Sequence, residues 1–241
     1  MNKPPVSGRL AQMGLPLTLR DDATFDNFHA GAGNNQLVVD ALQAACAAAG
    51  ARVVFLHGAA GSGCTHLLQA MCHQAADKQW TAIYLPLNEF MAENPEHILP
   101  GLEALDVVCL DNVHAVLGNP EWEEALFHLM NRLRDAKRLL LVAADQPPAQ
   151  LPVQLADLQS RLAAATVFRL DWPGDDDRLA LLKQRAASRG LVLEDDPARF
   201  ILSRAPRATG ELIALLDKLD AAALAQQRKL TLPFIKEVMG W

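Results

Sequence analysis

A glycine-rich turn at residues 58–65 constrains the fold more than any other feature of the sequence. It reads Gly-Ala-Ala-Gly-Ser-Gly-Cys-Thr and follows an apolar run, 53–57, that is typical of a buried strand. A helical pattern begins at Thr65. The spacing G-x4-G-x-[ST] between a strand and a helix is that of a P-loop, whose glycines let backbone N–H groups surround a phosphate. The turn therefore predicts a phosphate-binding loop, with a simple glycine-requiring strand–helix turn as the alternative.

The predicted loop lacks its usual cation, because Cys64 stands where a P-loop carries Lys. A second nucleotide element is expected at 107–112, where a buried strand ends in Asp111, the acidic position that holds Mg²⁺ through water. Asn112 stands where a second acid would orient the attacking water, and an amide cannot act as a base. The alternative for Asp111 is a cap on the next turn. The two departures predict no ATP hydrolysis by this chain alone, so we do not expect an enzyme.

Five short apolar runs without polar alternation predict strands buried on both faces. They lie at 52–57, 81–86, 106–111, 138–144 and 166–170. Helical patterns separate them, including one that Asn119 caps with Pro120 at its first position, and another at 150–162. This alternation predicts an α/β fold, a parallel sheet with helices on both faces.

After Trp172-Pro173-Gly174 the strand pattern stops. Helices are expected at 176–189, 195–204, 209–227 and 231–239. We therefore predict an extended tail at 1–22, an α/β domain at 23–172 and a small all-helical domain at 173–241.

Composition excludes several classes of protein. An apolar fraction of 51% with 21% charged residues argues against disorder. A net charge of −6 argues against a polybasic nucleic-acid binder, and we expect neither a membrane span nor a secretory signal. The cysteines, at 46, 64, 72 and 109, form no C-x-x-C pair and predict reduced thiols in a cytoplasmic protein. Zinc binding by Cys64, His66, Cys72 and His73 lacks ligand spacing, so no metal site is expected.

Six short motifs resemble the DnaA/Hda branch of the AAA+ family, which includes the bacterial replication initiator and its regulatory inactivators. They are Thr-Phe-Asp-Asn-Phe at 24–28, Gly-Cys-Thr-His-Leu-Leu at 63–68, Leu-Asp-Asn at 110–112, Asp-Gln-Pro-Pro at 145–148, Leu-Gln-Ser-Arg-Leu at 158–162 and Gln-Arg-Lys-Leu-Thr-Leu-Pro-Phe at 227–234. The resemblance covers about residues 10–241. It implies an AAA+ fold, with a five-stranded parallel sheet and a helical lid.

The resemblance also implies a negative regulator of replication initiation, which binds the DNA-loaded sliding clamp of DNA polymerase III and stimulates hydrolysis of DnaA-bound ATP. Arg161 would be the arginine finger, acting in trans; the alternative is a solvated surface arginine. The tail resembles the clamp-binding peptide Q-L-x-L-P-L, and contact with DNA would be indirect. Its expected clamp-binding residues are Gln12, Met13, Leu15, Pro16 and Leu17. Packing of these side chains on the parent domain is the alternative.

The resemblance implies ADP as the cofactor, but two departures argue against tight binding. Gly210 stands where the lid would carry its sensor Arg, with Arg207 three residues earlier as a partial substitute, and Cys64 replaces the loop Lys. The expected nucleotide-binding residues are Gly58, Gly61, Gly63, Cys64, Thr65, Asp111 and Asp145, the last at the first sensor position. The Cys64 thiol is either activated by the helix N-terminus or inert because burial raises its pKa.

Two other functions remain open from the sequence: a self-sufficient AAA+ ATPase such as a helicase loader, and a clamp-binding adaptor with an inactive AAA+ scaffold.

Overall fold

The computed structural model describes residues 19–31, 33–46, 52–172, 174–206 and 209–241. The predicted clamp-binding peptide at 12–17 and Arg207 lie outside these described residues.

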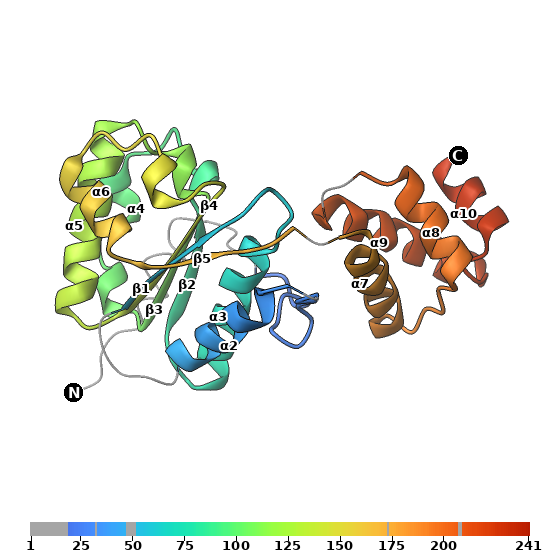
Figure 1. The fold of residues 1–241 in the computed structure, drawn as a ribbon. Coiled ribbons are helices and arrows are strands. Elements are labelled where there is room, and N and C mark those ends of the chain that lie inside the picture. The colour runs from blue at the N-terminus through green and yellow to red at the C-terminus, as the bar shows by residue number, and fades with distance from the viewer. Residues whose placement is uncertain (1–18, 32, 47–51, 173, 207–208) are drawn as a thin grey trace.

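A five-stranded parallel sheet forms the centre of the larger domain, in the order β2-β3-β4-β1-β5 (Figure 1). The strands are β1 Arg52–His57, β2 Ala82–Pro86, β3 Val107–Asp111, β4 Leu139–Ala144 and β5 Thr166–Arg169. All five predicted strands are confirmed, with one residue fewer at some ends. Every residue of β3 and β4 is buried, as their unbroken apolar runs predict.

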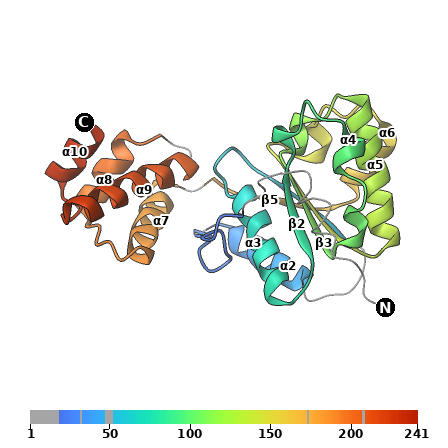
Figure 2. The same ribbon diagram turned by 180° about the vertical axis from the view of Figure 1, so that it is seen from behind.

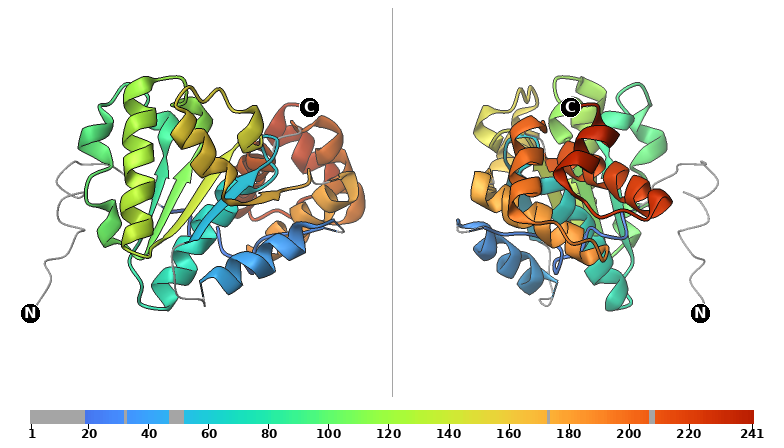
Figure 3. Two further views of the ribbon diagram at one scale, coloured as in Figure 1. Left: turned by 60° about the vertical axis from the view of Figure 1, so that its left-hand side comes forward. Right: turned by 90° about the vertical axis from the view of Figure 1, so that its right-hand side faces the viewer.

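Helices cover both faces of the sheet, and Figure 3 shows the two layers. One layer holds α2 Asn35–Ala45 and α3 Cys64–Asp77, and the other holds α4 Pro95–Ile98, α5 Pro120–Asp135 and α6 Ala156–Ala163. Single turns of 3₁₀ helix connect them: η1 Leu87–Glu89, η2 Leu102–Ala104, η3 Val113–Ala115 and η4 Pro148–Gln150. The strands send alternate side chains into two apolar cores, Phe55 toward α5 and Leu56 toward α3.

Helix α5 begins as predicted. The Asn119 side chain accepts a hydrogen bond from the backbone N–H of Glu121 at 3.0 Å, and Pro120 occupies the first helical position. Its apolar face, which includes Trp122 and Leu126, is buried against the sheet.

The helix predicted at 150–162 is wrong in its first half. Residues 148–150 form η4, residues 151–155 form no helix, and α6 begins only at Ala156. Pro152 explains the difference, because it lacks an N–H donor and disfavours helical backbone at Leu151, which has φ −74° and ψ 145°.

Four helices form the smaller C-terminal domain: α7 Asp175–Ser188, α8 Asp195–Arg204, α9 Thr209–Gln226 and α10 Leu232–Met239. They surround an apolar core of their own, in which Leu216 and Phe234 are fully buried. Seen from behind in Figure 2, this lid lies beside α3 and away from α6.

None of the helices in the described ranges combines the length and the hydropathy that a bilayer crossing requires.

Candidate nucleotide site and Arg161

The predicted phosphate loop connects β1 to α3 and has the backbone shape that the sequence indicated. Gly61 and Gly63 are left-handed, with φ of +87° and +106°, and α3 begins at Cys64. A Cβ on Gly63 would lie 2.6 Å from Cε2 of Phe28, so only glycine fits there. Since α3 begins directly after this turn, its N-terminal N–H groups face the space that a phosphate would occupy.

Asp111, at the end of β3, is the buried acid of the site. Its Oδ2 accepts hydrogen bonds from the Thr65 hydroxyl at 2.6 Å and the Tyr84 hydroxyl at 2.8 Å. Its Oδ1 accepts the backbone N–H of Asn112 at 2.9 Å, so the carboxylate also takes part in the next turn. Burial, together with the neighbouring Asp111, raises the pKa of Tyr84 and keeps the phenol a donor.

Asn112 and Cys64 supply no catalytic charge. The Asn112 side chain is an amide, and it donates to Oδ1 of Asn88 at 3.0 Å. Burial raises the pKa of the Cys64 thiol to about 11, so the hypothesis of an activated thiolate is wrong. At neutral pH this position therefore carries neither the positive charge of a lysine nor a negative one.

The expected nucleotide-binding residues line one cleft of about 470 Å³. Asp111, Asn112 and Asp145, at the ends of β3 and β4, line it, and so do Gly210 and Ile213 of the lid. Among the described residues that line the cleft, Arg20 is the only Lys or Arg, and its guanidinium pairs with Asp22 at 3.2 Å. The backbone therefore fits a phosphate group, whereas the side chains supply little positive charge to hold one.

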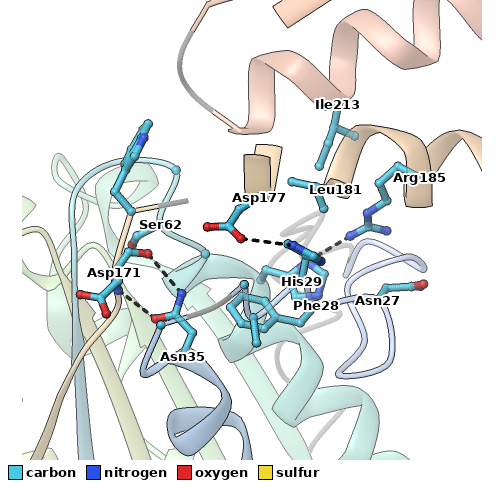
Figure 4. A pocket seen from close by; sticks show the side chains of 17 residues that line it. Asn27, Phe28, His29, Asn35, Ser62, Asp171, Asp177, Leu181, Arg185 and Ile213 are labelled. Carbon is cyan, nitrogen blue, oxygen red and sulfur yellow. Dashed lines mark hydrogen bonds and ion pairs between the residues drawn. The ribbon is translucent and has the colours of Figure 1, made fainter. Parts of the chain in front are cut away.

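A smaller pocket of about 130 Å³ adjoins this cleft, and both are lined by the loop residues 61–63, His66 and Ile213 (Figure 4). The pocket is lined by Phe28 and Trp172, two aromatic side chains that a flat ring could contact. Asn35 and Asp171 also line the pocket and are joined by two hydrogen bonds. The Asn35 side chain accepts the backbone N–H of Asp171 at 2.8 Å and donates to the carbonyl of Asp171 at 3.2 Å.

Arg185 of the lid joins three parts of the chain at the edge of this pocket. Its side chain is 3% exposed and donates to the backbone carbonyl and the carboxylate of Asp22 at 3.1 and 3.0 Å. His66, at the start of α3, lies 2.7 Å from the Thr24 carbonyl through Nε2 and 3.4 Å from Arg185 through Nδ1. Since a carbonyl only accepts, Nε2 carries the proton and Nδ1 faces the guanidinium. We call this set of contacts the lid latch.

Arg161 is separate from this cleft. It lies in the last turn of α6, and Figures 1 and 2 place α6 on the side of the sheet away from the lid. Its side chain is half-buried, and no acceptor among the described residues is within hydrogen-bond or ion-pair distance of its guanidinium. The geometry does not bring Arg161 to the phosphate loop of its own chain.

Residues 19–168 match the family of the bacterial DnaA ATPase domain, and residues 175–239 match the Hda lid domain. The chain belongs to the DnaA family of AAA+ proteins and is of the Hda type.

Solved structures share the fold. Domain III of DnaA from Thermotoga maritima is similar with a TM-score of 0.79 at 22% identity, over 92% of this chain and 98% of that one. AMPPCP-bound DnaA from Aquifex aeolicus is similar with a TM-score of 0.70 at 24% identity, over 83% of this chain and 65% of that one. The branch migration motor RuvB from T. maritima is similar with a TM-score of 0.65 at 22% identity, over 92% of this chain and 72% of that one. The AAA+ fold predicted from the sequence is confirmed.

Sequence reasoning missed the side chains that this DnaA-family protein uses to fix the site. Tyr84, Asn35 and Arg185 belong to none of the motifs identified in the sequence. Each acts on a residue distant in the chain, and Arg185 and Asp22 are 163 positions apart. Within the described residues, no group of three His, Cys, Asp or Glu side chains is arranged to hold a metal ion.

Proposed function

We propose that this Hda-type protein is a negative regulator of replication initiation that stimulates the hydrolysis of DnaA-bound ATP in trans. One observation carries the proposal: Arg161, in the last turn of α6, is not among the described residues that line its own cleft and has no described partner. A partly exposed arginine without a described partner is available to a nucleotide in a neighbouring molecule.

The chemistry asked of Arg161 is transition-state stabilisation. As the γ-phosphoryl group leaves, charge develops on its oxygens, and a planar guanidinium can donate several N–H groups to them. The residue needs no proton transfer, since arginine stays charged. Its contribution therefore belongs to the rate of hydrolysis more than to the affinity for DnaA.

The cleft of this chain has a different role in the proposal. Its backbone loop, with Thr65 and the guanidinium of Arg20, would hold the phosphates of ADP, and the adjoining aromatic pocket would hold the base. Burial keeps Cys64 neutral, and Asn112 cannot act as a base, so the bound nucleotide would not be turned over. We expect binding weaker than that of a P-loop with its lysine.

The tail at 12–17 would bind the sliding clamp. An extended peptide with two or three apolar anchors and a proline suits a hydrophobic groove, because proline lowers the entropy cost of holding it extended. The described chain is fixed to α3 directly afterwards: the N–H of Arg20 donates to Gln69 at 3.1 Å, and its carbonyl lies 3.0 Å from His73 Nε2. A clamp on the tail would thus be held close to the AAA+ domain.

Single-turnover conversion of ATP to ADP on DnaA tests the proposal. ATP-loaded DnaA is mixed with clamp-loaded DNA, with and without this protein, and the ADP is counted over time. Faster conversion that needs both clamp and protein is expected. Clamp binding without any acceleration would leave an adaptor, and steady-state ATP hydrolysis by the isolated chain would leave a self-sufficient ATPase.

A further inference from the structure

Glu123, in the first turn of α5, is a buried carboxylate that the proposed function does not use. Its residue is 1% exposed. In the described part of the chain it faces backbone donors, with no Lys or Arg within ion-pair distance. Oε1 accepts from Gly118 at 2.8 Å, and Oε2 accepts from Leu155 at 2.7 Å. The N–H of Gln154 reaches both oxygens, at 3.1 and 3.0 Å.

These donors belong to two separate segments. Gly118 lies in the turn before α5, whereas Gln154 and Leu155 are the last residues before α6. Leu155 occupies the N-cap position of α6, and its side chain cannot cap. The Gln154 side chain adds a return bond to the carbonyl of Gly118 at 3.2 Å. Glu123 thus joins the beginning of α5 to the beginning of α6.

The beginning of α6 determines where Arg161 lies. The helix runs only from Ala156 to Ala163, so Arg161 follows the anchored Leu155 by six residues, a rise of about 9 Å. Leu158 and Leu162 pack the inner face of the helix into the core, with exposures of 1% and 2%. Apolar packing holds α6 on the domain, while the Glu123 carboxylate holds the direction in which it starts.

We propose that Glu123 is the positioning residue for Arg161 and sets the orientation of α6 toward the nucleotide of a neighbouring molecule. This inference rests on the proposed role of Arg161 as an arginine finger. A misplacement of about 1 Å can cost a catalytic group on the order of 100-fold in rate. A residue that fixes the start of so short a helix therefore controls the reaction without touching phosphate.

Glu123→Gln is the informative substitution because it keeps the size of the side chain. An amide has one accepting oxygen, so its NH₂ group must face an N–H of Gly118 or of Leu155. Either Gly118 or Leu155 then loses its acceptor, and the link between the two segments is weakened. Glu124→Gln is the matched control, since the neighbouring Glu124 side chain is 75% exposed.

The assay is clamp-dependent hydrolysis of DnaA-bound ATP as a function of the concentration of this protein. For Glu123→Gln we expect a maximal rate roughly 10- to 100-fold lower. The concentration of this protein that gives a half-maximal rate should change little. The Glu124→Gln protein should match wild type. In an Arg161→Ala background, Glu123→Gln should lower the rate no further, because a positioning residue acts only through the group it positions.

Three results would overturn the inference: a wild-type maximal rate for folded Glu123→Gln, an effect confined to the half-saturating concentration, or a full additional loss in the Arg161→Ala background.

If Glu123→Gln does not fold, Gln154→Ala replaces it. Gln154 is exposed, and this variant removes only the side-chain bond to Gly118, so we expect a several-fold lower maximal rate, and an unchanged rate would count against the inference. Full activity of Arg161→Ala alone would instead reject the arginine-finger proposal.

Discussion

Acidification is expected to destabilise the protein through one side chain of the lid latch, His66. Burial lowers the pKa of His66 to about 4 from an ordinary value of 6.5. The folded protein therefore keeps the imidazole neutral, with Nε2–H donated to Thr24 and Nδ1 facing Arg185. A proton on Nδ1 would set a second cation against the Arg185 guanidinium.

The sign of the effect follows from the lowered pKa. The unfolded chain binds a proton as the pH falls below about 6.5, whereas the folded chain stays neutral until about 4. Stability contributed by His66 is therefore complete above pH 6.5 and is lost as the pH falls toward 4. One proton changes the free energy of unfolding by about 1.4 kcal/mol per pH unit, so His66 removes about 2 kcal/mol between pH 7 and pH 5. The pKa of Asp22 is also lowered, because its two neighbouring guanidinium groups outweigh its burial, but that loss lies below pH 4.

Urea unfolding followed by tryptophan fluorescence between pH 7.5 and pH 4.5 measures this loss. His66→Gln keeps an N–H donor for Thr24 but cannot bind a proton, so its stability should fall less with acidification than that of wild type, by about 2 kcal/mol at pH 5. Burial also lowers the pKa of His57, and the comparison with the variant removes that contribution. His128→Gln, at a side chain 56% exposed, should follow wild type. Parallel declines for wild type and His66→Gln would refute the reasoning.

Three further variants test the rest of the account. Cys64→Lys should tighten ADP binding by 10-fold or more in calorimetry, because it returns a cation to the loop; an unchanged dissociation constant would mean that the loop does not contact phosphate. Replacing Leu15 and Leu17 with Ala should abolish clamp pull-down, at about 1–3 kcal/mol for each lost anchor, with the melting temperature unchanged; intact pull-down would remove the clamp assignment. Arg185→Met should increase hydrogen exchange at residues 20–24, which the lid latch holds; unaltered exchange would show that other contacts fix that segment.

The sheet could be predicted from the sequence because its strands are buried on both faces. Runs such as 107–110 and 139–144 are apolar without interruption, and local composition then suffices. The beginning of α5 could be predicted for a similar reason, since Asn119 and Pro120 act on their immediate neighbours in the sequence. The predicted helix at 150–162 failed although the signal was again local: Pro152 disfavours helical backbone at its neighbour Leu151, and α6 begins only at Ala156.

The candidate site was predictable where a motif carries the geometry and hidden where distant residues meet. The loop glycines followed from spacing, and Thr65 and Asp111 were expected at the same site, whereas the hydrogen bond between them is seen only in the structure. The contacts that orient the site, Glu123 with the start of α6 and Arg185 with Asp22, join segments 31 and 163 positions apart. No local pattern marks such pairs, because each depends on the packing of helices that the sequence predicts only separately.

The effect of Arg161→Ala on the rate of hydrolysis of DnaA-bound ATP tests the central claim most directly. The variant should fold normally and bind clamp as wild type does, while the clamp-dependent rate falls by about 10³-fold or more. Arg161→Lys should restore little, because a point charge cannot replace the planar set of donors. Full stimulation by folded, clamp-bound Arg161→Ala would contradict the claim that this chain supplies the arginine finger.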